Sequence, residues 1–166
     1  MISQLVQEAL NEQINMEFGS SYTYLSMSAY CERQNFTGSA QWLRTQSQEE
    51  QVHAMKLFDF LLARDCPVVL RAIEAPKVAF ESVPHVFHES LENEIVVSDA
   101  IDSLYELAHK EKAFAALVEL QWFITEQVEE VKTAREILTK FNMVRDDPSA
   151  LLDLDRELGT RNSVAE

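Results

Sequence analysis

Glu50 and His53 stand three residues apart, a spacing that brings both side chains to one face of a helix. Leu43 and Leu57 lie seven residues before and after Glu50, so we expect this face to be buried among apolar side chains. A buried carboxylate beside an imidazole is a candidate metal site. Taken alone the Glu-x-x-His step is a weak signal, because helices are rich in glutamate and a lone histidine usually satisfies a local hydrogen bond.

Other rows of apolar residues with heptad spacing also carry polar residues at mid-length. The interrupting residues are Glu17, Glu94, Gln127 and Glu130. Burying several unpaired carboxylates at one level is costly, and bound cations remove that cost. Carboxylates with one imidazole form the mixed oxygen and nitrogen set that suits iron or manganese, and no thiolate joins them to favour zinc or copper(I). The alternative is that these acids are solvated on helix rims. In that case a polar residue would interrupt the apolar row at mid-length of every long helix by coincidence.

The elements that position these residues are predicted to be long helices. Apolar periodicity predicts a first helix over about residues 3–33 and a second over about 39–64, with Thr37 as the N-cap of the second. Residues 65–81 form a long connection. About 17 extended residues span roughly 55 Å, more than the roughly 39 Å of a helix of about 26 residues. The second and third helices are therefore able to run parallel.

Helical periodicity resumes near residue 82 and continues to about residue 141. One helix of about 58 residues would extend about 87 Å, too long for a single domain. We therefore expect the chain to fold back at residues 109–112. Asp147 and Pro148 predict the start of a short fifth helix, with Asp147 as N-cap and Gly159 as its C-terminal stop. We expect the tail, residues 160–166, to fray.

Composition places limits on the class of protein. The 166 residues predict one domain, residues 1–166, and only three glycines and four prolines favour long helices with few tight turns. A formal net charge of −14 argues against a nucleic-acid partner and favours cations. Cys31 and Cys66 form no disulfide framework and fit a reducing cytoplasm. Because neither a signal peptide nor a membrane-spanning apolar stretch is recognisable, we expect a cytoplasmic protein.

Over essentially its whole length the chain resembles the ferritins, and among them the non-haem ferritins of prokaryotes. The residues that carry the resemblance are Glu17, Tyr24, the run Glu49-Glu50-x-x-His53, Glu94, Trp122 and the run Glu126-Gln127-x-Glu129-Glu130. The resemblance implies an all-α, ferritin-like four-helix bundle with one long crossover and a short fifth C-terminal helix. It also implies a homo-oligomeric hollow shell of twenty-four subunits.

The resemblance further implies an iron centre with two positions. Glu17, Glu50 and His53 would hold one iron ion. Glu50, Glu94 and Glu130 would hold the other, with Glu50 bridging the two ions. Gln127 would lie nearby.

Three further acids, Glu49, Glu126 and Glu129, resemble with Glu130 the third iron site of prokaryotic ferritins. A solvated helix face is the alternative for the three. Tyr24 could donate an electron during iron oxidation, or it could be a core tyrosine hydrogen-bonded to a carboxylate.

The function implied is ferroxidase activity, the oxidation of Fe²⁺ by O₂ or H₂O₂, together with storage of ferric mineral inside the shell. Bacterioferritins carry a haem-ligating methionine where Val52 stands here, so we expect no haem. One alternative is a di-iron enzyme that removes peroxide or activates oxygen on the same bundle. Another is a purely structural bundle with solvated acids. Short loops argue against an oxygenase.

Overall fold

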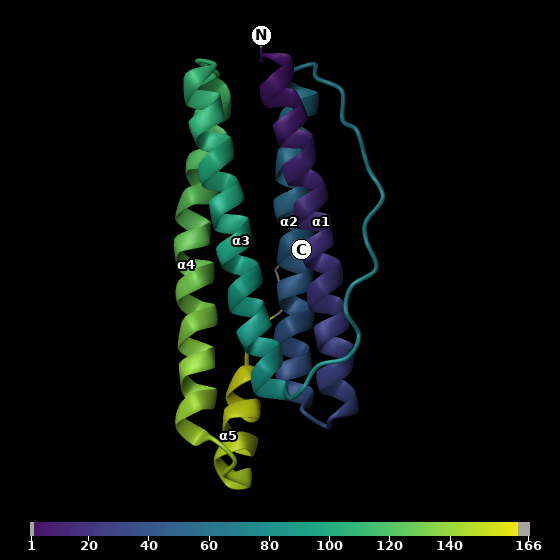
Figure 1. The fold of residues 1–166 in the computed structure, drawn as a ribbon, viewed down its shortest axis with the longest axis vertical. Coiled ribbons are helices and arrows are strands. Elements are labelled where there is room, and N and C mark those ends of the chain that lie inside the picture. Colours follow the sequence, from purple (N-terminus) through teal and green to yellow (C-terminus); the bar gives the residue numbers. More distant parts are fainter. Residues whose placement is uncertain (1, 163–166) are drawn as a thin grey trace.

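Five helices make up the described part of the chain, residues 2–162, in a computed structural model (Figure 1). They are α1 (Gln4–Arg33), α2 (Thr37–Ala63), α3 (Val83–Lys110), α4 (Phe114–Val144) and α5 (Pro148–Leu158). The four long helices form the bundle, and α5 packs against α2 and α4 at the end where α4 finishes (Figure 1). The predicted all-α bundle with a short fifth helix is confirmed.

The connection between α2 and α3 runs along the outside of the bundle from one end to the other (Figure 1). It returns the chain to the end where α2 begins, so α2 and α3 run parallel, as the chain-length argument predicts. Asn11 of α1 fixes the start of this extended segment. Its Nδ2 donates to the carbonyl of Pro67 over 3.1 Å, and its Oδ1 accepts from the amide of Val69 over 2.6 Å. These bonds satisfy backbone groups that have no partner within secondary structure.

The turns that end the long helices use left-handed residues other than glycine. Lys112, with φ of 55°, marks the break between α3 and α4 inside the predicted interval. Asn35, Asp65 and Arg145 also have a positive φ, of 62°, 54° and 49°. A non-glycine residue is disfavoured there by roughly 1–2 kcal/mol. The break therefore carries no glycine signal in the sequence.

The N-terminus of α2 is capped by a residue distant in sequence. The prediction of Thr37 as N-cap is wrong, since Phe36 occupies that position and makes no side-chain capping bond. The Asp155 carboxylate of α5 instead accepts from the backbone amides of Gly38 over 3.0 Å and Ser39 over 2.7 Å. Free amides at a helix N-terminus favour such an anion. The predicted cap of α5 is confirmed, because Asp147 accepts from the amide of Ala150.

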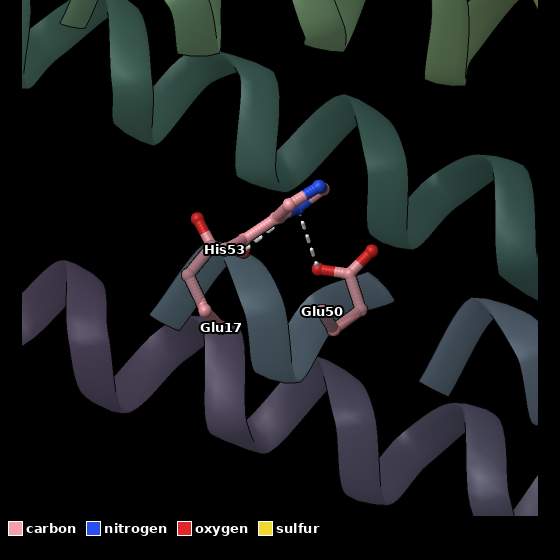
Figure 2. Close-up of side chains that lie close together, drawn as sticks. All are labelled: Glu17, Glu50 and His53. Carbon is pink, nitrogen blue, oxygen red and sulfur yellow. Dashed lines mark ion pairs between the residues drawn. The ribbon is translucent and has the colours of Figure 1, made fainter. Parts of the chain in front are cut away.

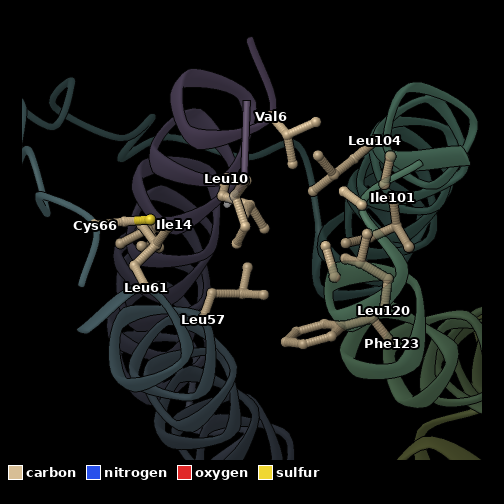
Figure 3. Close-up of a cluster of buried hydrophobic side chains, with 14 of the residues drawn as sticks. Val6, Leu10, Ile14, Leu57, Leu61, Cys66, Ile101, Leu104, Leu120 and Phe123 are labelled. Atoms are coloured by element: carbon tan, nitrogen blue, oxygen red, sulfur yellow. The ribbon is translucent and has the colours of Figure 1, made fainter. Parts of the chain in front are cut away.

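Two clusters of buried apolar side chains fill the bundle on either side of a polar layer. Each long helix contributes to the cluster drawn in Figure 3, through residues that include Leu10, Leu57, Ile101 and Leu120. Each also contributes to the second cluster, through residues that include Tyr24, Leu43, Phe87 and Phe141. The polar residues predicted from the heptad rows lie between these positions on every helix. The apolar clusters thus enclose the polar layer from both ends.

The residues after α5 are ordered further than we expected. The Thr160 amide donates to the Glu157 carbonyl, and the Arg161 side chain contacts α2, so the predicted fraying is wrong for these two residues. Residues 163–166, to which the same prediction applied, lie outside the described residues. Among the helices of residues 2–162, none is long and apolar enough to cross a membrane.

Candidate metal centre

Six polar residues meet in the middle of the bundle, contributed by all four long helices. Helix α1 provides Glu17, α2 provides Glu50 and His53, α3 provides Glu94, and α4 provides Gln127 and Glu130. All six are buried, and Glu130 is the most exposed of them at 8%. The burial that heptad spacing predicts for these residues is therefore observed. Burial of four carboxylates at one level is costly in a protein without a counter-charge.

The imidazole of His53 lies between two carboxylates (Figure 2). Its Nδ1 is 3.6 Å from Oε2 of Glu50 and 4.0 Å from Oε2 of Glu17. Both Oε2 atoms are buried and accept no hydrogen bond within the described residues. The other oxygen of each carboxylate is occupied: Gln13 Nε2 donates to Glu17 Oε1 over 2.7 Å, and Gln46 Nε2 donates to Glu50 Oε1 over 3.2 Å.

The side chains of Glu17, Glu50 and His53 are close enough together to bind one cation. One ligand atom from each of Glu17, Glu50 and His53 lies within 4.8 Å of the others. A divalent ion coordinated there would use the two carboxylate oxygens that lack a hydrogen-bond donor, and it would offset their charge. Oxygen and imidazole nitrogen donors suit iron and manganese. A metal ion bound between these side chains would satisfy both unpaired oxygens.

The carboxylate of Glu94 is held by hydrogen bonds from two helices. Tyr24 on α1 donates to Oε1, and Gln127 on α4 donates to Oε2 over 3.3 Å. The Tyr24 hydroxyl also lies 3.2 Å from the hydroxyl of Ser90. Glu130 accepts from Gln46 Nε2 over 2.8 Å, so one amide group of α2 contacts carboxylates on both α2 and α4.

Burial sets the protonation of this layer. It raises the pKa of Glu17, of Glu50 and of Glu94 above the ordinary carboxyl range. Burial and then the charge of Glu94 raise the pKa of Glu130 to about 8. Hydrogen bonds from Tyr24 and Gln127 offset part of the effect at Glu94. A cation stabilises the ionised forms, so its binding releases protons.

The same architecture and sequence occur in known proteins. Residues 7–144 match the ferritin-like domain. The chain is 38% identical over 165 residues to a probable bacterial non-haem ferritin-like protein of Haemophilus influenzae, which covers 99% of this chain and 100% of that protein. It is 35% identical over 161 residues to a bacterial non-haem ferritin of Staphylococcus aureus, covering 97% of each. The chain belongs to the ferritin family.

A solved ferritin has nearly the same fold. The open-pore ferritin of the hyperthermophilic archaeon Archaeoglobus fulgidus has a TM-score of 0.97 to this chain at 43% identity. The comparison covers 98% of this chain and 100% of that one. The likeness therefore extends over the long crossover and the fifth helix as well as the four long helices.

In the present chain, the three acids expected at a third iron site, Glu49, Glu126 and Glu129, occupy three different environments. Glu126 is half-buried and offers an oxygen within 4.8 Å of ligand atoms of His53 and Glu130. Glu49 forms an ion pair with Arg161. Glu129 is exposed. The structure thus brings Glu126 to the buried centre and does not bring the other two into a metal-sized group with it.

Sequence reasoning missed the two glutamines that hold the carboxylates. Gln13 and Gln46 each precede a buried glutamate by four residues, which places amide and carboxylate on one helix face. That repeated spacing in the sequence could have indicated both glutamines.

Trp122 and Phe123 pack edge-on against His53, with ring centroids 5.3 and 6.1 Å away. These contacts restrict the imidazole to the orientation that faces Glu17 and Glu50.

Proposed function

We propose that this protein stores iron, oxidising Fe²⁺ at the buried centre and retaining ferric mineral inside a hollow shell of twenty-four identical subunits in the cytoplasm. One observation carries the proposal: the two buried carboxylate oxygens without hydrogen bonds both face the imidazole of His53. Family membership supports iron as the ion. The acidic surface, with a net charge of −14, attracts cations to the assembly.

The first iron position in this proposal consists of Glu17, Glu50 and His53. The atoms of these side chains that would bind the metal already lie close together, so binding of iron requires little rearrangement. Gln13 and Gln46 hold the remaining oxygens and keep the two carboxylates oriented.

The second position consists of Glu50, Glu94 and Glu130, with Glu50 bridging and Gln127 adjacent. Glu94, Glu130 and Oε1 of Glu50 are engaged by hydrogen-bond donors, which an ion at the second position must displace. The carboxyl groups of Glu94 and Glu130 have raised pKa values, so they lose protons when the ion binds. We expect this position to fill after the first.

Oxidation follows from the donor set. Anionic oxygens stabilise Fe³⁺ more than Fe²⁺, because the smaller and more highly charged ion gains more from them. Two Fe²⁺ ions supply two electrons, which together with two protons reduce O₂ to H₂O₂, or H₂O₂ to two water molecules. The proposal assigns Tyr24 the role of an additional electron donor, and the hydrogen bond from its hydroxyl to the proposed ligand Glu94 supports this role.

A di-iron enzyme that removes peroxide or activates oxygen is the alternative function on this bundle. The two functions differ in whether iron is retained. Metal-free protein is loaded aerobically with Fe²⁺ well beyond the capacity of the centre, and its native mass and iron content are then measured together. A large assembly that keeps the iron supports storage. A small particle that oxidises Fe²⁺ and releases it supports the alternative.

The role of Glu50 is tested in the same assay. Glu50→Ala removes the only side chain assigned to both positions, and we expect rapid oxidation to fall by about 100-fold or more, since loss of groups outside the ligand sphere alone costs 10–100-fold. Glu106→Ala, an exposed glutamate of α3 paired with Lys110, is the matched control. If Glu50→Ala assembles and oxidises Fe²⁺ at the normal rate, its bridging role is wrong.

A further inference from the structure

The chain beyond α5 turns back and places one guanidinium against α2, beside the metal centre. Arg161 Nη1 donates to Oε1 of Gln46 over 2.9 Å, and Nη2 donates to Glu49. The guanidinium carbon lies 4.5 Å from the ring centroid of Trp42. Arg161 therefore contacts three residues of α2 on successive turns of one helix face.

The docking of α5 determines where Arg161 lies. Asp155 accepts from the backbone amides of Gly38 and Ser39 and from the Ser39 hydroxyl, which fixes α5 on the start of α2. A Cβ on Gly38 would be 1.8 Å from the carbonyl oxygen of Asp155, so only glycine permits this approach. Gly159 meets Gly38 at the same crossing.

The hydrogen bond from Arg161 determines which way the Gln46 amide faces. A guanidinium has donors only, so it requires the amide oxygen of Gln46 on its side. The amide nitrogen must then face the metal centre, where it contacts Glu50 Oε1 and Glu130 Oε2. A flipped amide would turn its oxygen toward both carboxylates and would repel them in the ionised forms that bind a metal. Gln46 thus connects Arg161, outside the centre, to two proposed ligands inside it.

We infer that Arg161 is a positioning residue of the metal centre, which acts through Gln46 on Glu50 and Glu130. The inference rests on the proposed function, because it assigns a role toward the metal that Glu17, Glu50 and His53 would bind. With Oε1 of Glu50 held by Gln46, Oε2 stays free for the metal. The C-terminal segment after α5 therefore contributes to iron binding without touching iron.

Lysine cannot replace this arginine. The planar fork of Arg161 reaches Gln46 with one nitrogen and Glu49 with the other, and it stacks on Trp42. Lysine offers a single ammonium without that geometry. Arg161→Lys keeps the charge and therefore separates the orienting role from simple charge compensation.

The test uses Co²⁺ binding to the metal-free, assembled protein, followed by titration calorimetry and by the visible absorption of the bound ion. Loss of groups that orient metal ligands typically costs 10–100-fold in affinity. For Arg161, one contact further out, we expect affinity to fall about fivefold in Arg161→Gln, with an altered absorption band, and less in Arg161→Lys. Arg156→Gln is the matched control, because Arg156 lies on α5, is exposed and pairs with the exposed Asp153.

A double-mutant cycle tests the route through Gln46. In a Gln46→Leu background, Arg161→Gln should cause no further loss of Co²⁺ affinity. A full additional loss would overturn the route. Equal affinity and spectrum in Arg161→Gln and wild type would overturn the positioning role while leaving the proposed function intact. If wild-type protein binds no Co²⁺, or binds it equally well in Glu17→Ala, the proposed function fails and this inference fails with it.

Discussion

Tyr24 on α1 donates a hydrogen bond across the bundle to Glu94 on α3. Both side chains are buried, and the phenol is completely shielded from solvent. Burial, together with the charge of Glu94, raises the pKa of Tyr24, so its proton stays on the phenol at neutral pH. A phenol that loses an electron readily loses its proton as well, and the carboxylate of Glu94 is in place to accept it.

Tyr24→Phe tests this arrangement. Removal of the hydroxyl should abolish the transient tyrosyl radical expected when O₂ is mixed with anaerobic Fe²⁺-loaded protein. Freeze-quench electron paramagnetic resonance is the measurement. Glu94 also loses a donor, and an unsatisfied buried acceptor costs about 1–3 kcal/mol, so the metal-free variant should melt at a lower temperature. A radical of unchanged intensity in the variant would show that another residue donates the electron, with Trp122 as the next candidate.

The stability of the metal-free protein should fall as pH rises. The pKa of Glu130 is about 8 in the folded protein and about 4.3 in an unfolded chain. Between these values the folded state holds a proton that the unfolded state has released, so raising the pH favours unfolding. We expect a loss on the order of 1–3 kcal/mol per subunit between about pH 5 and pH 8.

Calorimetric melting of chelator-treated protein measures this loss. Glu130→Gln should flatten the pH dependence, because it removes the titrating group. Addition of Co²⁺ should reverse the dependence, since metal binding strengthens as the ligands lose protons. Metal-free protein whose stability rises from pH 5 to 8 would contradict the raised pKa values.

Glu126 should matter more than Glu129 for iron beyond the first two positions. Alanine at Glu49, Glu126 or Glu129 should leave the first two positions able to bind, because these residues contribute no ligand to them. Glu126 lies within 4.8 Å of His53 and Glu130, whereas Glu129 is exposed, so Glu126→Ala should slow later oxidation most. Stopped-flow measurement of the Fe²⁺ oxidation rate at increasing iron loads tests which of the three substitutions slows later oxidation most. A third metal peak that persists after all three substitutions would refute the assignment.

Haem should not bind stoichiometrically. Val52, which stands where bacterioferritins carry a haem-ligating methionine, has no donor atom for iron. Protein purified after haem is supplied should show no Soret band, and Val52→Met is the matched variant for comparison. A stoichiometric band in the wild type would contradict this prediction.

The sequence predicts the level of the metal centre well, because heptad rows report burial directly. Glu17 between Leu10 and Tyr24, and Glu94 between Phe87 and Ile101, could be recognised as interruptions of a core face. Which oxygen of each carboxylate stays free could not be predicted. That depends on the side-chain conformations of Gln13 and Gln46, which are set by packing across helices.

Contacts between residues far apart in sequence were also beyond prediction. Asp155 replaces the local cap expected from Thr37, and it does so from a helix that starts more than a hundred residues later. Arg161 falls in a polar tail with no periodicity, so nothing in the pattern indicated that it contacts Gln46. Such contacts follow from the docking of α5, which the three-dimensional structure alone reveals.

The most direct test of the central claim is diffraction at the iron absorption edge from crystals soaked anaerobically in Fe²⁺. We predict an anomalous peak bonded to Glu17, Glu50 and His53, using the two buried carboxylate oxygens that accept no hydrogen bond within the described residues. The peak should be absent from Glu50→Ala crystals and unchanged in Glu106→Ala crystals. Iron found only at exposed carboxylates, or a peak at the centre that survives Glu50→Ala, would contradict the account.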